Sequence, residues 1–288
     1  MNILYIIFGE KIIYHIQAYL SIRTFQKQLD NSDKIYVMTT KPELYRHAGV
    51  NVIPINEDTI REWEGDFHFF WRVKIKALEY MSNHYPDSHV LYLDTDTFLY
   101  GRLSELRERL NLGEGIMHKD EGHPSQMISR SKRMWNQVSG KTYAGIRLGM
   151  KHHMFNAGVV AIPQDKLHTV ITTALAICDS MLAEEVEHVV IEQYSLSISL
   201  YEYTNLTEGD NCIGHYWGNK DEWERFAIEM LSKAYMQNMD ADEEMTLINE
   251  SDFNMIPIHI HHSSTAARIS KFVNRLFKDK NITYINQR

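Results

Sequence analysis

Two carboxylates at the end of an apolar run are the residues in this chain with the clearest chemical meaning. Residues Val90 to Leu93 are apolar or aromatic without a break, and Asp94 and Asp96 follow them. Such a short, non-alternating run predicts a strand buried on both faces, and open α/β sheets bind ligands beyond the carboxyl ends of their strands. Side chains two apart on an extended chain point the same way, roughly 6–7 Å apart. Their mutual repulsion favours a bound divalent cation.

The elements before this run predict the first half of a doubly wound α/β sheet. Apolar runs predict strands over residues 2–8, 34–39 and 50–55. An apolar stripe predicts a helix over residues 12–28, and we expect Thr40 to cap a second helix with Glu43 reaching back to it. A β-α-β-α-β opening is typical of nucleotide-binding sheets. It lacks a GxGxxG loop, so any α/β domain would satisfy this pattern.

The rest of the chain predicts further alternation of helices and strands. We expect helices over residues 69–81, 103–110, 166–181, 187–200 and 221–236, and extended segments over 115–118, 155–163, 211–217 and 256–262. Asp165 is expected to cap the helix that follows it. Residues Lys119 to Met150 are the least regular, and we interpret them as a lid or acceptor-side loop. Residues Asp240 to Asp252 are interpreted as an acidic loop.

One domain over residues 1–262 and a C-terminal extension over 263–288 describe the expected organisation. Residues Ser264 to Lys280 predict a basic amphipathic helix. Its apolar side would carry Ile269, Phe272, Val273 and Leu276, and its basic side Arg268, Lys271, Arg275 and Lys278. Such a helix most often docks on its own protein, and contact with a membrane surface is the alternative.

Composition excludes some classes of protein. The 288 residues carry a formal net charge of −8, which argues against a general nucleic-acid binder. Cys178 and Cys212 are far apart and without metal spacing, as expected of reduced thiols in a cytoplasmic protein. No export signal is visible, and no stretch approaches the ~18 apolar residues of a membrane span.

The D-x-D and four further stretches, in the same order along the chain, resemble glycosyltransferase family 8, which has the GT-A fold and includes glycogenin and lipooligosaccharide galactosyltransferases. The hydrophobe-D-x-D ending at Asp96 resembles its metal motif, and the sequence FNAGV at residues 155–159 matches closely. The segment HYWGNK at 215–220 resembles H-x-x-G-x-x-K-P-W, with the lysine one residue early and no proline. Glu192-Gln193 stands where the family has an acidic residue before Gln, and Lys74 where it has a basic residue that touches the donor.

The resemblance implies a transfer of sugar from a nucleotide diphosphate, with UDP expected as the nucleotide and retention of the anomeric configuration. Asp94, Asp96 and His215 would hold the cation, and two carboxylates with one imidazole suit Mn²⁺ better than Ca²⁺. The family admits Mg²⁺ as well. The acceptor would be a glycan or a lipid-linked sugar.

The remaining candidates have roles around the donor. Lys220 and backbone N–H groups near Gly218 would contact the phosphates, and Lys74 would pair with Asp94 or the donor. Asn156 offers a donor and an acceptor to sugar hydroxyls, and Ala157 leaves room for a sugar ring. Glu192 or Gln193 would face the developing oxocarbenium ion. On position alone, the base and ribose would meet Phe8, Tyr14 and Thr39.

Two other functions fit part of the sequence. A phosphatase of the haloacid dehalogenase type also ends a strand in D-x-D, but it requires Thr or Val where this chain has Phe98, and its strand normally comes first. A non-catalytic carbohydrate-binding protein on a degenerate GT-A fold is the second alternative. His259, His261 and His262 alternate on an extended segment and are rival metal ligands, although no carboxylate accompanies them.

Overall fold

The computed structural model describes residues 1–127, 129–187 and 190–260, together with residues 269 and 272. Within these residues, the main sheet has seven strands in the order β12-β6-β11-β4-β1-β2-β3. They are β1 (Asn2–Ile7), β2 (Lys34–Thr39), β3 (Asn51–Pro54), β4 (Val90–Leu93), β6 (Glu114–Met117), β11 (Val159–Ile162) and β12 (Asn205–Glu208). Only β11 runs antiparallel to its neighbours, β4 and β6, among these strands. The sheet is therefore mixed.

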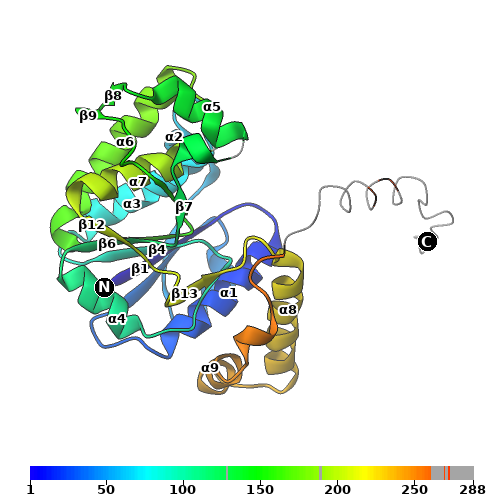
Figure 1. Cartoon of the computed structure of the whole chain (residues 1–288). Helices are drawn as coiled ribbons and strands as arrows, with labels where there is room; N and C mark the ends of the chain where they lie inside the picture. The colour runs from blue at the N-terminus through cyan, green and yellow to red at the C-terminus, as the bar shows by residue number, and fades with distance from the viewer. Residues whose placement is uncertain (128, 188–189, 261–268, 270–271, 273–288) are drawn as a thin grey trace, which may run out of the picture.

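Helices cover both faces of the sheet (Figure 1). One face carries α2 (Glu57–Glu64), α3 (Arg72–His84), α6 (Leu167–Ala183) and α7 (Ile191–Tyr203), and the other carries α1 (Ile12–Gln26) and α4 (Leu103–Asn111). Alternate residues of β1 enter the two cores, since Leu4 belongs to the first and Ile3 and Tyr5 to the second. Burial on both faces is the reason why the strand sequences are apolar without alternation.

Smaller elements complete the described chain. Strand β5 (Thr97–Leu99) pairs with β13 (Ile213–His215), β7 (Asp120–Gly122) with β10 (Met154–Phe155), and β8 (Thr142–Tyr143) with β9 (Ile146–Arg147). Helices α8 (Lys220–Met236) and α9 (Ala241–Asn249) pack against α1 and against each other. The remaining elements are α5 (Ser129–Val138) and the 3₁₀ turns η1 (Pro42–Tyr45), η2 (Pro124–Gln126), η3 (Gln164–Lys166) and η4 (Phe253–Met255).

Four local predictions are wrong. Thr40 does not cap a helix, because the chain makes the 3₁₀ turn η1 after Lys41 with no side-chain cap. Asp165 lies inside η3 rather than at a helix N-cap. Residues 119–150 are not one irregular loop, since they contain α5 and three short strands. The acidic segment after Asp240 is the helix α9, whose capping box the aspartate completes with Glu243.

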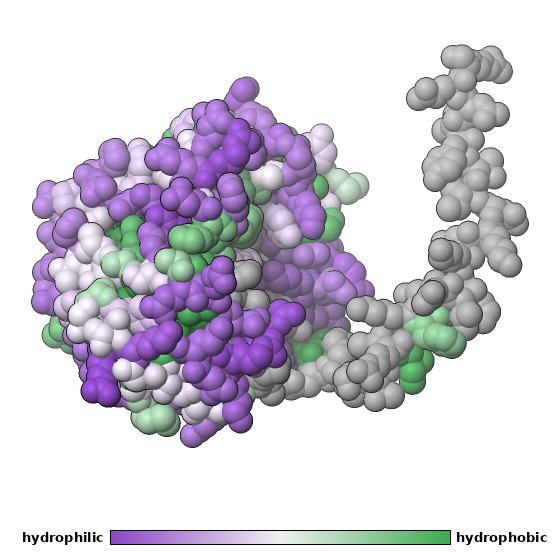
Figure 2. Space-filling model, turned by 90° about the horizontal axis from the view of Figure 1, so that it is seen from above, coloured by the Kyte–Doolittle hydropathy of each residue, from purple (hydrophilic) through white to green (hydrophobic). Residues whose placement is uncertain are grey.

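The face of the molecule seen in Figure 2 is mainly hydrophilic, and its hydrophobic residues lie in scattered patches. Among the described residues, no helix combines the length and apolar character that crossing a bilayer requires. The predicted basic helix over 264–280 lies outside the described residues, apart from Ile269 and Phe272, which are exposed.

Candidate metal centre and donor pocket

The turn that leaves β4 positions the two aspartates. The backbone N–H of Asp94 donates to the carbonyl of Gly158, the residue before the neighbouring strand β11, at 2.8 Å. The Tyr92 hydroxyl donates to Asp94 Oδ1 at 2.7 Å, and the Thr97 hydroxyl donates to the Asp94 carbonyl at 2.8 Å. Asp94 is partly exposed, whereas Asp96 is only 4% exposed. The turn is thus held from both sides, and its carboxylates occupy different environments.

Strand pairing brings a histidine from far along the chain to these aspartates. Because β13 runs antiparallel to β5, His215 lies opposite Thr97, the residue after Asp96. Its Nε2 lies 3.3 Å from Asp96 Oδ1. One ligand atom from each of Asp94, Asp96 and His215 lies within 4.8 Å of the other two. Three residues that are distant in sequence therefore form one candidate metal group.

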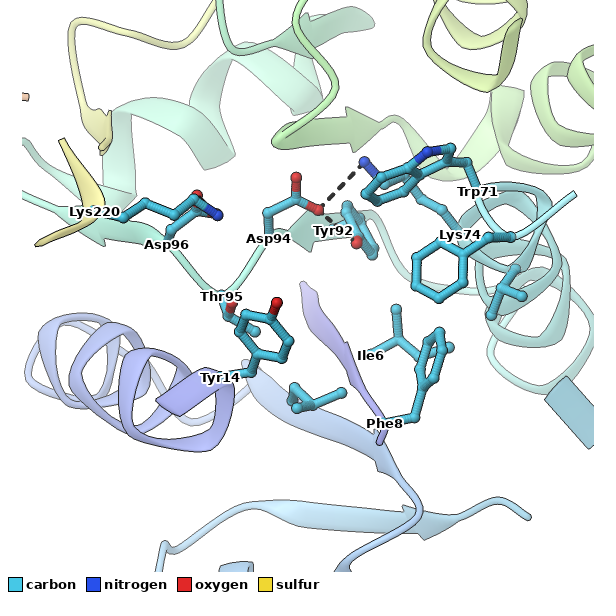
Figure 3. A pocket seen from close by; sticks show the side chains of 13 residues that line it. Ile6, Phe8, Tyr14, Trp71, Lys74, Tyr92, Asp94, Thr95, Asp96 and Lys220 are labelled. Carbon is cyan, nitrogen blue, oxygen red and sulfur yellow. Dashed lines mark hydrogen bonds and ion pairs between the residues drawn. The ribbon is translucent and has the colours of Figure 1, made fainter. Parts of the chain in front are cut away.

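Each aspartate also faces a lysine (Figure 3). Lys74 Nζ lies 3.2 Å from Asp94 Oδ1 and donates to the carbonyl of Ala157 at 3.0 Å. Lys220 Nζ lies 2.8 Å from Asp96 Oδ2. Burial by itself would raise the pKa of Asp96, but His215 and Lys220 outweigh it and hold that pKa well below its usual range. Asp96 is therefore ionised at neutral pH.

The donor atoms fit a divalent cation. Two carboxylates supply hard oxygen ligands, and an imidazole nitrogen is a ligand that Mn²⁺ accepts better than Ca²⁺ does. Nδ1 of His215 lies 3.0 Å from Asn156 Oδ1, a partner that leaves Nε2 directed at the aspartates. Metal-binding histidines typically have such an outer partner.

A cavity of about 260 Å³ adjoins the aspartates. It brings together the candidates Phe8, Tyr14, Lys74, Asp94, Asp96 and Lys220, and Tyr92 and Thr95 also line it. Phe70 and Trp71 line it too, and they are about half exposed, at 47% and 45%. Sequence reasoning missed this pair, although two adjacent aromatic residues before a helix are visible in the sequence. Thr39 is fully buried and does not line the cavity.

Other predicted residues meet beside the metal group rather than in this cavity. The backbone N–H of Ala157 donates to Gln193 Oε1 at 3.3 Å. Glu121, which sequence reasoning also missed, accepts from the amides of Asn156 and Gln193, both at 3.0 Å. No motif marked Glu121, since it belonged to the segment interpreted as irregular.

Glu192 is a buried acid on α7. It is 6% exposed, and its Oε2 has no hydrogen-bond partner among the described residues. Burial raises the pKa of Glu192 to about 7, although the charge of Lys74 acts in the opposite direction. A carboxyl group with this pKa holds or releases a proton near neutral pH.

The loop after His215 is tied to the end of the described chain. The backbone of Gly218 bridges to His259, whose ring fills the space that a Cβ at Gly218 would need. The Pro257 carbonyl accepts from Asn219 Nδ2 at 2.7 Å and from Trp223 Nε1 at 3.1 Å. We call residues 257–260 the C-terminal strap. His259 thus packs on the loop, and His261 and His262 lie outside the described residues.

Comparison with known proteins bears on the fold. No protein-family model and no curated protein sequence matches the chain. The crystal structure of the galactosyltransferase LgtC in complex with donor and acceptor sugar analogues is similar, with a TM-score of 0.50 and 14% identity over 89% of this chain and 98% of that chain. Mouse xyloside xylosyltransferase 1 in its apo form gives a TM-score of 0.47 and 12% identity over 73% and 85%. The predicted α/β fold, a GT-A type mixed sheet flanked by helices, is confirmed.

Proposed function

We propose that this protein is a metal-dependent glycosyltransferase that moves a sugar from a nucleotide diphosphate, UDP foremost, to a glycan or lipid-linked acceptor. One observation carries the proposal: Asp94, Asp96 and His215 converge beside a cavity on a fold shared with a galactosyltransferase. A bound Mn²⁺ or Mg²⁺ would neutralise the charge that builds on the leaving diphosphate.

The chain's own residues divide the remaining work. Lys74 and Lys220 form ion pairs with Asp94 and Asp96, and they would pair with phosphate oxygens once a bound cation neutralises these aspartates. The N-terminus of α8, which begins at Lys220, would assist them. Phe8 and Tyr14 face the same cavity and would contact the base and ribose. Backbone N–H groups near Gly218 would complete the phosphate contacts.

Sugar transfer requires groups beside the metal ligands, outside the lining of the cavity proposed for the nucleotide. Asn156, Ala157 and Gln193 form one hydrogen-bonded group there, and the small side chain of Ala157 leaves room for a sugar ring. We infer that Gln193 or Glu192 faces the oxocarbenium ion and that the leaving phosphate deprotonates the acceptor hydroxyl, which gives retention. NMR of the product anomer tests this step, and an inverted product would contradict it.

Calorimetry with UDP and Mn²⁺ tests the proposal as a whole. We expect UDP binding that depends on Mn²⁺. The variant Asp96→Ala should fold normally but lose this Mn²⁺-dependent binding of UDP. Asp165→Ala, an exposed aspartate in η3, is the matched control. A screen of nucleotide sugars should then show Mn²⁺-dependent turnover. Tight glycan binding without turnover of any donor would favour a non-catalytic carbohydrate-binding protein. Phosphatase activity would favour a phosphatase of the haloacid dehalogenase type.

A further inference from the structure

The side-chain amide of Asn156 is fixed in one orientation. Its Oδ1 accepts from the backbone N–H of Gly158 and lies on His215 Nδ1, both at 3.0 Å. Its Nδ2 donates to a carboxylate oxygen of Glu121 at 3.0 Å. If the amide were turned over, its NH₂ would face the Gly158 N–H and its oxygen would face the Glu121 carboxylate, so both hydrogen bonds would be lost.

This orientation of the Asn156 amide requires that Nδ1 of the His215 ring carry a hydrogen. An amide oxygen carries no hydrogen, so the ring must donate from Nδ1. Nε2, which faces Asp96 Oδ1 at 3.3 Å, is then the nitrogen that gives up its hydrogen when a cation binds. A lone pair opposite a carboxylate is the arrangement that a shared cation stabilises, and the tautomer of a metal-binding histidine is set in this way by its outer partner.

Glu121 anchors the arrangement from β7. One carboxylate oxygen accepts from Asn156 and the other from Gln193 Nε2, each at 3.0 Å. Because a carboxylate is an acceptor only, it forces both amides to present an NH₂ to it and an oxygen to the far side. The oxygen of Asn156 then meets the Gly158 N–H and His215, and the oxygen of Gln193 meets the Ala157 N–H.

The ring of His215 has little freedom to turn elsewhere. A Cβ at position 158 would lie 2.1 Å from Cε1 of the ring, so the ring fills the space above Gly158. His118 packs edge-on against it, with ring centroids 5.2 Å apart. Contact fixes the plane of the ring, and Asn156 decides which nitrogen carries the hydrogen.

We propose that Glu121 and Asn156 are positioning residues that hold His215 in the Nδ1–H form, so that Nε2 is ready for the metal. This inference rests on the proposed function and changes the role of Asn156. With Oδ1 accepting twice and one N–H on Glu121, its amide keeps a single N–H for a sugar hydroxyl.

Mn²⁺ affinity of the full chain provides the first test, measured by electron paramagnetic resonance of free Mn²⁺. Asn156→Ala should weaken binding about 10–100-fold, the usual effect of removing an outer partner of a metal ligand. Asn156→Asp should weaken it as well, since two carboxylates would then face each other across a 3.0 Å contact. Glu202→Gln is the control, because Glu202 contacts His152, away from the metal group, at 2.8 Å.

A double variant separates this role from general damage to the fold. In Glu121→Gln with Asn156→Asp, the amide and the carboxylate exchange places. The new amide at position 121 then donates to position 156 and still accepts from Gln193, while the new carboxylate at position 156 still accepts from His215 and Gly158. Mn²⁺ affinity should return to within a few-fold of the wild type. A double variant as weak as Asn156→Asp would overturn the inference.

Nitrogen-15 NMR of the metal-free chain supplies a measurement that does not depend on metal binding. The imidazole signals of His215, identified by their loss in His215→Gln, should show hydrogen on Nδ1 in the wild type, and Asn156→Ala should reduce the fraction of rings that carry hydrogen there. Unchanged tautomer and unchanged Mn²⁺ affinity in Asn156→Ala would refute the role of Asn156. A wild-type chain that shows the Nδ1–H form but binds no Mn²⁺ would instead refute the proposed function.

Discussion

At the scale of single residues, two acids of the site form ion pairs, whereas a third acid, Glu192, forms none in the described part of the chain. Asp94 and Asp96 each have a lysine, whereas Glu192 is buried with an unpartnered oxygen. A buried acid destabilises the folded state when it ionises unless a nearby cation outweighs burial, and the charge of Lys74 does not do so here. Residues of this kind are retained for a purpose other than stability, which is consistent with the role that we propose for Glu192 in sugar transfer.

The pKa of Glu192 predicts the pH dependence of stability. In the unfolded chain this carboxyl loses its proton near pH 4.5, and in the folded chain near pH 7. Between these values only the folded state holds the proton, so Glu192 stabilises the fold below pH 4.5 and this contribution is lost as pH rises through 7. Glu192→Gln should therefore gain about 3 kcal/mol of unfolding free energy relative to the wild type between pH 4.5 and pH 8.

Urea unfolding of the metal-free protein at several pH values measures this difference. Glu202 offers a control of opposite sign: burial acts to raise its pKa, but Lys151 and His152 outweigh burial and lower it. Glu202→Gln should accordingly lose stability relative to the wild type as pH rises. A pH-independent difference for Glu192→Gln would show that the carboxyl is ionised throughout this range.

A second residue-scale prediction concerns Gly158. A methyl group there would overlap the His215 ring, with Cβ 2.1 Å from Cε1. Gly158→Ala should displace the ring, reduce the unfolding free energy by about 1–3 kcal/mol and weaken Mn²⁺ binding at least tenfold. Gly149→Ala is the matched control, because a Cβ at Gly149 meets nothing within 4 Å. Normal Mn²⁺ affinity in Gly158→Ala would mean that His215 is not a ligand.

At the scale of elements, the sequence predicts what depends on local pattern. Strands β1, β2 and β4 are buried on both faces and could be recognised from unbroken apolar runs. Helix α9 was missed, although Asp240 and Glu243 have the spacing of a capping box. Thr40 and Asp165 have cap-forming side chains, but a cap also needs a helix that starts at the next residue.

The site depends on pairing between distant elements, which local pattern does not determine. His215 could be matched to Asp96 only through the motif resemblance, because the register of β13 on β5 is a property of the folded chain. Glu121 reaches Asn156 and Gln193 because β7 pairs with β10, the strand that ends just before Asn156. A short strand such as β7 has too few residues to show an alternating pattern.

At the scale of the whole molecule, charge is unevenly distributed along the chain. The formal net charge is −8, while residues 264–280 are basic. We propose, as an extension of the function above, a cytoplasmic protein that reaches a lipid-linked acceptor through this segment.

Sedimentation of the full chain with lipid vesicles tests the membrane proposal. Binding should require anionic lipid and fall as salt rises, since each Lys or Arg near such a surface contributes about 1 kcal/mol. Replacing Arg268, Lys271, Arg275 and Lys278 by Gln should abolish binding and leave Mn²⁺-dependent UDP binding unchanged. Equal sedimentation of this variant with the same vesicles would contradict the proposal.

The C-terminal strap gives the membrane proposal a mechanical consequence. Ile260 donates its backbone N–H to the Gly218 carbonyl at 3.2 Å, and Lys220 follows Gly218 by two residues. Tension applied to the chain beyond Ile260 would thus travel through one hydrogen bond and a few covalent bonds to the ammonium group that touches Asp96. Tethering of the tail and binding of the diphosphate are thus mechanically connected, so the place where the protein is tethered can influence its affinity for the donor.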